Sequence, residues 1–300
     1  MRIPMAEQHI FQGLSVACVT PFKEDFSIDK EAYVNHLNYM IDGGVDGLVI
    51  CGTTGESPTF SDEEFEYLIG TAVDMAKDKC KVIAGSGTNA TNKSIKRSKM
   101  AEKLGSDGLL IVAPYYNKPV QEGLIGHYTT IADTVDVPLI VYNVPGRTSV
   151  NILPETIAQL AEHPNIVAVK EASGNMQQVL KIIASVPDDF AVLSGDDAMT
   201  LPLIAAGGKG IVSVAGNEVP DKMKAFTEAC LSDDIKKARS LHYELQPLML
   251  ANFWQSNPIP VKAAMSMMGR MENVLRLPLV PLDKKYEAGL RDILDELGVL

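Results

Sequence analysis

A lysine that ends a buried apolar segment is the sharpest candidate for chemistry in this sequence. Lys170 follows the apolar residues 166–169, so in a parallel strand its amine would lie at the strand's carboxyl end, partly shielded from water. Desolvation disfavours the ammonium, lowers the pKa and frees the amine to attack a carbonyl carbon. Taken alone, however, a lysine more often reaches solvent, or pairs with a neighbour such as Glu171.

Hydroxyl and guanidinium groups also lie at or just after the ends of other apolar segments. Thr53 and Thr54 follow Gly52 in a tight turn, where hydroxyls and N–H groups can converge on a carboxylate, although such a turn can also satisfy itself. Tyr142 ends another apolar segment, which suits proton transfer or an aromatic cap on the core. Arg147 follows a Pro-Gly turn and suits bidentate contact with a carboxylate, but a surface arginine would look the same.

Neither a metal nor an organic cofactor is indicated. The five histidines have no H-x-x-x-H or similar ligand spacing, and Asp196-Asp197 is better interpreted as turn capping than as a magnesium site. The four cysteines, at 18, 51, 80 and 230, form no C-x-x-C pair and are expected to be reduced, buried thiols.

Eight short apolar segments, bounded by Gly, Asp or Pro, recur at a fairly even spacing and are typical of parallel strands covered by helices. They are 14–19, 47–51, 81–84, 108–112, 139–142, 166–170, 191–194 and 210–214. Helical patterns lie between them. Asp29 precedes one at 30–41, a Ser61/Glu64 capping box begins one that reaches about Lys77, and others span 91–104 and 154–162.

Eight strand–helix repeats predict an α/β fold, a (β/α)₈ TIM barrel, over residues 1–232. Residues 233–300 predict a C-terminal helical appendage with helices at 233–250, 261–268 and 283–297. Neither G-x-G-x-x-G nor G-x-x-x-x-G-K-[ST] occurs, which disfavours an open nucleotide-binding sheet. Barrel enzymes work at the carboxyl ends of their strands, where the candidate residues fall.

Composition excludes several classes of protein. The 300 residues are 46% hydrophobic and carry a formal charge of −11, so a sizeable core is expected while nucleic acid and membrane surfaces are disfavoured as partners. Residues 1–13 lack the apolar run of a signal peptide, and no stretch approaches the roughly 18 apolar residues of a membrane span. A cytoplasmic globular protein is expected.

Five ordered motifs resemble the dihydrodipicolinate synthase family, which belongs to the pyruvate-dependent class I aldolases that include N-acetylneuraminate lyase. They are Gly-Thr-Thr-Gly-Glu (52–56), Pro-Tyr-Tyr-Asn (114–117), Tyr-Asn-Val-Pro-Gly-Arg-Thr (142–148), Lys-Glu-Ala (170–172) and Ser-Gly-Asp-Asp (194–197). The resemblance runs from Val19 to Lys262, nearly the whole chain.

The resemblance implies a Schiff-base lyase of lysine and diaminopimelate biosynthesis that condenses pyruvate with L-aspartate 4-semialdehyde. Lys170 would form an imine with the keto carbon of pyruvate. Tyr142 would donate and accept protons, linked through Thr53 to Tyr116, whose ring comes from a neighbouring subunit. A homotetramer, built as a dimer of dimers, is therefore implied.

The remaining implied roles concern substrate binding. Thr54 would hold the pyruvate carboxylate, and the Val212 backbone would lie beside it. Arg147 would take the carboxylate of the aldehyde substrate at the entrance, and Gly195 would line the pocket.

Two alternatives remain. A sister aldolase acting on sialic acid or 2-keto-3-deoxy sugar acids would keep Lys170 and Tyr142, but such relatives usually have Gly-Ser-Thr-Gly-Glu and lack an arginine matching Arg147. A non-catalytic barrel would have no reason to keep Lys170, Tyr142, Thr53 and Arg147 together.

The sequence departs from lysine-inhibited members of the family. They bind lysine between subunits with a glutamate on the helix after the third strand and histidines on the helix after Gly-Thr-Thr-Gly-Glu. Here Lys93 stands at the glutamate position, and Asp62 and Phe65 at the histidine positions. Weak or absent feedback inhibition by L-lysine is expected, because Lys93 would repel the ammonium groups of that ligand.

Overall fold

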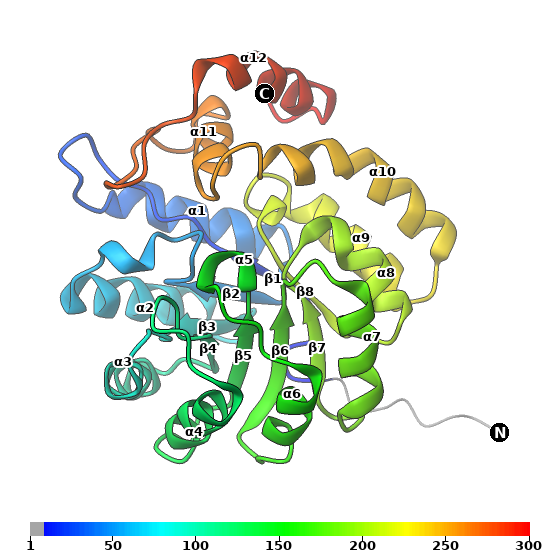
Figure 1. Cartoon of the computed structure of the whole chain (residues 1–300). Coiled ribbons are helices and arrows are strands. Elements are labelled where there is room, and N and C mark those ends of the chain that lie inside the picture. The colour runs from blue at the N-terminus through cyan, green and yellow to red at the C-terminus, as the bar shows by residue number, and fades with distance from the viewer. Residues whose placement is uncertain (1–8) are drawn as a thin grey trace.

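Eight parallel strands pair side by side in chain order and close into a barrel, with β1 beside β8 (Figure 1). The computed structural model describes residues 9–300. The strands are β1 (Gly13–Ala17), β2 (Gly47–Ile50), β3 (Lys81–Gly85), β4 (Gly108–Val112), β5 (Leu139–Asn143), β6 (Ile166–Glu171), β7 (Ala191–Ser194) and β8 (Gly210–Ser213). Each expected segment forms a strand, so the predicted (β/α)₈ barrel is confirmed.

A helix follows each strand and covers the barrel (Figure 1). These helices are α1 (Lys30–Asp42), α2 (Asp62–Ala76), α3 (Thr91–Lys103), α4 (Gln121–Ala132), α6 (Pro154–Leu160), α7 (Met176–Ser185), α8 (Thr200–Ala205) and α9 (Pro220–Leu231). Short helices lie in the loops: η1 (Ser57–Thr59), α5 (Pro145–Thr148), η2 (Asp197–Met199) and η3 (Ala215–Asn217). The predicted caps are confirmed, since Asp29 accepts from the Ala32 N–H and Ser61 forms a capping box with Glu64.

Alternation along the strands separates two apolar layers. On β5, Ile140 and Tyr142 belong to the cluster inside the barrel, while Leu139 and Val141 pack in the layer between barrel and helices. Successive side chains of a strand point to opposite faces, so Asn143 at the end of β5 faces the helices. The same alternation on β6 places Ala168 and Lys170 inside the barrel, and Val169 and Glu171 outside it.

Most predicted strand ends are within one residue of the observed ones, and the end of β1 differs most. Segment 14–19 was expected to be a strand throughout, but β1 ends at Ala17. The Val19 N–H donates to Asn217 Oδ1 (3.0 Å) instead of to a neighbouring strand. A side chain about 200 positions away thus ends the strand, although Cys18 and Val19 stay buried.

Three further helices, α10 (Ile235–Ala251), α11 (Ile259–Met267) and α12 (Lys284–Glu296), follow the barrel. In Figure 1, α11 and α12 lie at the top of the view, beyond the ends to which the arrowheads of β5 and β6 point. α10 packs against α9 and α12, and Trp254 stacks on Tyr286 with ring centroids 5.6 Å apart. α10 begins two residues later than the predicted 233, because the Asp234 side chain caps it by accepting from the Lys237 N–H.

The four cysteines are free and buried, as expected. Within residues 9–300, no helix has the length and apolar character needed to cross a membrane. The expectation that residues 1–13 carry no signal peptide falls partly on residues 1–8, which lie outside the described residues.

Candidate active site

Lys170 and Tyr142 face each other inside the barrel at the carboxyl ends of two neighbouring strands. They are direct partners in the β5–β6 register, and both are buried. The Lys170 Nζ lies 4.4 Å from the centroid of the Tyr142 ring. The alternative in which Lys170 pairs with Glu171 is not found, because the Glu171 carboxylate accepts from Asn143, Ser173 and Gln178 on the outer face of the barrel.

Burial sets the protonation of this pair. Desolvation lowers the pKa of Lys170 to about 8; the nearby Asp197 charge opposes the shift, and the Arg147 charge adds to it. Burial also raises the pKa of Tyr142, opposed by Arg147 and by a hydrogen bond with Thr53. Near neutral pH the site therefore combines a partly neutral amine with a protonated phenol.

The turn after β2 brings two hydroxyl groups to the same cavity. It lies between Cys51 and Glu56, both in the left-handed region with φ of 57° and 63°. The buried Thr54 Oγ1 accepts a hydrogen bond from Asn257 Nδ2 (2.9 Å). Thr54 is the acceptor in this bond, so the bond does not use its hydroxyl proton, which can donate to a ligand oxygen.

Arg147 supplies positive charge at the mouth of the cavity. It lies on the short helix α5, is exposed, and donates from Nη2 to the Asn257 carbonyl oxygen (3.1 Å). The guanidinium is thus held against the protein while keeping other N–H groups for a ligand. An oxyanion such as a carboxylate matches this geometry.

Most of the predicted residues line a single cavity: Thr53, Thr54, Tyr142, Arg147, Lys170 and Gly195. Gly195 gives the lysine room, because an added Cβ would lie 3.0 Å from Lys170 Cε and 2.7 Å from Ala172 Cβ. Two predicted residues lie elsewhere. Val212 is buried inside the barrel while Val214 lines the cavity, and Tyr116 is 89% exposed, away from the cavity of its own chain.

The region after the barrel contributes to the site, and sequence reasoning missed this contribution. Phe253 and Asn257 both line the cavity. Asn257 joins two predicted groups, since its side chain contacts Thr54 and its carbonyl accepts from Arg147. The resemblance extends through the Asn-Pro-Ile-Pro-Val-Lys segment at 257–262 but assigns no role to Asn257.

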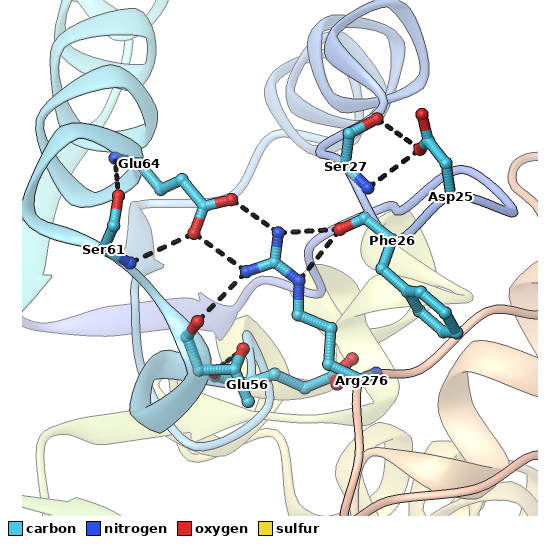
Figure 2. A network of polar contacts seen from close by, with 8 residues as sticks. Asp25, Phe26, Ser27, Glu56, Ser61, Glu64 and Arg276 are labelled. Carbon is cyan, nitrogen blue, oxygen red and sulfur yellow. Dashed lines mark hydrogen bonds and ion pairs between the residues drawn. The ribbon is translucent and has the colours of Figure 1, made fainter.

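A buried ion pair supports the threonine turn from behind. Lys262 Nζ lies 2.7 Å from Glu56 Oε1, and both side chains are fully buried. The other carboxylate oxygen of Glu56 accepts from the Arg276 backbone N–H (2.9 Å). Figure 2 shows the Arg276 guanidinium between Phe26 and Glu64, where it donates to the Phe26 carbonyl and to the Glu64 carboxylate. The C-terminal segment therefore holds the turn at several points.

The acidic pair after β7 acts in turn capping, as expected. Asp196 accepts from the Ala198 N–H. Asp197 accepts from the Ser213 hydroxyl and from the N–H groups of Val214 and Ala215. No group of three or more potential metal ligands occurs among residues 9–300.

Comparisons with known proteins agree with this geometry. The model of the Dihydrodipicolinate synthetase family matches residues 10–297. A 4-hydroxy-tetrahydrodipicolinate synthase from Thermotoga neapolitana is 49% identical over 295 residues, which is 97% of this chain and 100% of the relative. Two solved dihydrodipicolinate synthases superpose with TM-scores of 0.95. One, from Thermotoga maritima, is 46% identical and covers 97% of this chain and 100% of its own. The other, from Cyanidioschyzon merolae with lysine bound, is 40% identical and covers 98% and 100%.

The enzyme class is that of 4-hydroxy-tetrahydrodipicolinate synthases, lyases of lysine and diaminopimelate biosynthesis. The alternative of a sister aldolase for sialic acid or sugar acids is not favoured. The chain belongs to the dihydrodipicolinate synthetase family.

Proposed function

We propose that this chain condenses pyruvate with L-aspartate 4-semialdehyde through an imine at Lys170. The observation that carries the proposal is the buried Lys170 amine, with its pKa lowered to about 8, beside the Tyr142 phenol in a cavity with Arg147 at its mouth. A partly neutral amine is the nucleophile that imine formation requires.

The reaction proceeds by imine formation, carbon–carbon bond formation and ring closure. The Lys170 amine adds to the keto carbon of pyruvate, and loss of one water gives the imine. The imine withdraws electrons, so the methyl group loses a proton and an enamine forms. The enamine carbon attacks the aldehyde, whose oxygen gains a proton. The substrate's amine then adds to the imine carbon and expels Lys170 as the ring closes. The imine formed on Lys170 is the electron sink, so the reaction needs neither a metal nor an organic cofactor.

The surrounding residues take the roles that their positions allow. The free Thr54 hydroxyl proton binds the pyruvate carboxylate, and Arg147 binds the carboxylate of the second substrate. Tyr142, hydrogen-bonded to Thr53, moves protons at the imine and at the aldehyde oxygen. Gly195 leaves space for the adduct, and the strand that carries Val212 lies next to β7, which Gly195 follows.

Borohydride reduction tests the covalent step. Pyruvate with borohydride should add a reduced pyruvyl group at Lys170, seen by peptide mass, and Lys170→Arg should remove it while the chain stays folded. A coupled assay then compares aspartate semialdehyde with a sugar aldehyde. An adduct on another residue, or turnover of the sugar aldehyde alone, would overturn the proposal.

We also propose a cytoplasmic homotetramer in which Tyr116 of one protomer completes the site of another. The exposed Tyr116 side chain, in the left-handed region with φ of 75°, supports this assembly, because an exposed aromatic in a strained conformation suits an interface. Within each protomer we divide the chain into a barrel of residues 1–232 and a helical region of residues 233–300, between α9 and α10.

A further inference from the structure

The two residues that follow the reactive pair are linked on the opposite face of the same strands. Asn143 follows Tyr142 on β5, Glu171 follows Lys170 on β6, and the two are partners in the strand register. Both are buried, with exposures of 0% and 3%. While Tyr142 and Lys170 face the cavity, Asn143 and Glu171 face the helices α6 and α7.

Glu171 is the acceptor at the centre of a closed polar ring. Its Oε2 accepts from Asn143 Nδ2 (2.9 Å) and Gln178 Nε2 (3.2 Å), and its Oε1 accepts from the Ser173 N–H (2.6 Å). Asn151 completes the ring by accepting from Asn143 (2.9 Å) and donating to Gln178 Oε1 (2.8 Å). Asn143 Oδ1 also accepts from the Ile152 N–H (3.0 Å).

The donor and acceptor types in this ring require a carboxylate at position 171. Three N–H donors converge on its two oxygens, and a carboxylate offers only acceptors. Hydrogen bonds to a charged acceptor are stronger than neutral ones. The Asn143–Glu171 bond therefore ties the ends of β5 and β6 together one residue beyond the reactive pair.

We propose that Glu171 and Asn143 are positioning residues that fix the separation of the Tyr142 phenol and the Lys170 amine. The inference rests on the proposed imine chemistry. Proton transfer between a phenol and an imine depends steeply on their separation, and a displacement of about 1 Å can cost roughly a hundredfold in rate. Arg147 lies on α5 and is anchored by the Asn257 carbonyl, and within residues 9–300 Glu171 has no hydrogen bond to the loop that carries α5, so a change at Glu171 should leave binding of the second substrate intact.

Glu171→Gln is the main test, because it keeps the size of the side chain and turns an acceptor into a donor. We expect kcat and the rate of pyruvate trapping at Lys170 to fall roughly ten- to hundredfold, with an unchanged KM for aspartate semialdehyde. Asn143→Ser removes the amide that joins the other strand to Glu171. It should lower kcat and pyruvate trapping in the same way, and it tests the inference if Glu171→Gln does not fold. The swap Glu171→Gln/Gln178→Glu returns a carboxylate to the ring and should restore part of kcat.

Asn165→Ala is the matched control. Asn165 immediately precedes β6 at its opposite end, and its Nδ2 donates to the Ala132, Val135 and Val137 carbonyls. This variant should lower the melting temperature and leave kcat unchanged well below it. If Glu171→Gln behaves like Asn165→Ala, the ring is only structural and the inference fails. If the wild-type chain traps no pyruvate at Lys170, the proposed function fails instead.

Discussion

The reactivity of the Lys170 amine is a consequence of its burial. An ammonium loses hydration inside the barrel, and its pKa falls to about 8. At pH 7 about one tenth of such amines are neutral, against less than about one in a thousand at an ordinary lysine pKa. The rate of imine formation with pyruvate, followed by rapid quenching, should therefore rise with pH and level off above about 8. Lys170→Arg is the control, and a rate that stays flat across this range would contradict the assignment.

We expect Arg147 to determine the affinity for the second substrate. Its guanidinium is exposed and anchored to the Asn257 carbonyl, so its loss should leave the fold intact. A hydrogen bond to a charged group contributes about 1.5–3 kcal/mol, so Arg147→Ala should raise the KM for aspartate semialdehyde roughly ten- to hundredfold. Arg147 also lowers the pKa of Lys170, so pyruvate trapping is best compared above pH 8, where it should be unchanged. An equal loss of pyruvate trapping and of aspartate semialdehyde binding would refute this role of Arg147.

For the secondary-structure elements, the sequence predicted the features that depend on residues close together in the chain. Apolar runs marked the strands, and Ser61 with Glu64 marked a helix start three residues apart. Contacts between distant segments had no such signal: Asn257 reaches Thr54 across 203 positions, and the Asn143–Glu171 bond spans 28. One clue was available. Lys262 interrupts an apolar helix, and a lysine buried there must have a partner, but only the fold identifies that partner as Glu56.

The Glu56–Lys262 pair gives a prediction at this scale. Removing one partner leaves a buried charge uncompensated, so Lys262→Met should lower the free energy of unfolding by about 3–5 kcal/mol. The double variant Glu56→Gln/Lys262→Met removes both charges and should lose much less. Denaturant unfolding measures both variants. If the single and double variants lose the same free energy of unfolding, Lys262 stabilises the fold by packing and not by its charge.

For the whole molecule, the position of Tyr116 predicts sites shared between protomers. Tyr116→Phe and Lys170→Arg should each be nearly inactive as pure proteins. After the two are unfolded and refolded together, hybrid dimers contain one site with both groups intact, so about a quarter of wild-type activity should return. Sedimentation checks assembly in parallel. No recovery in hybrids, or a fully active monomer, would place Tyr116 outside the site.

Inhibition by L-lysine would also depend on the assembled molecule, since the resemblance places the lysine site between subunits. In this chain Lys93 is exposed on α3, and Lys96 Nζ lies 2.6 Å from Asp62 Oδ2. The carboxylate that could have attracted a lysine ammonium thus already has a cation, while Phe65 is fully buried with Arg97 above its ring. Several positive charges therefore surround a site that would have to bind a ligand with two ammonium groups.

We therefore expect L-lysine at tens of millimolar to leave the rate of this chain nearly unchanged, although a relative of 40% identity has been solved with lysine bound. Lys93→Glu reverses the charge at one exposed position of α3 and should make lysine a measurable inhibitor, because opposite charges now face each other. Titration of lysine against both proteins at equal ionic strength makes the comparison, since salt screens surface charge. Inhibition of the unmodified chain with a sub-millimolar midpoint would show that other groups hold the ligand despite the cations around it.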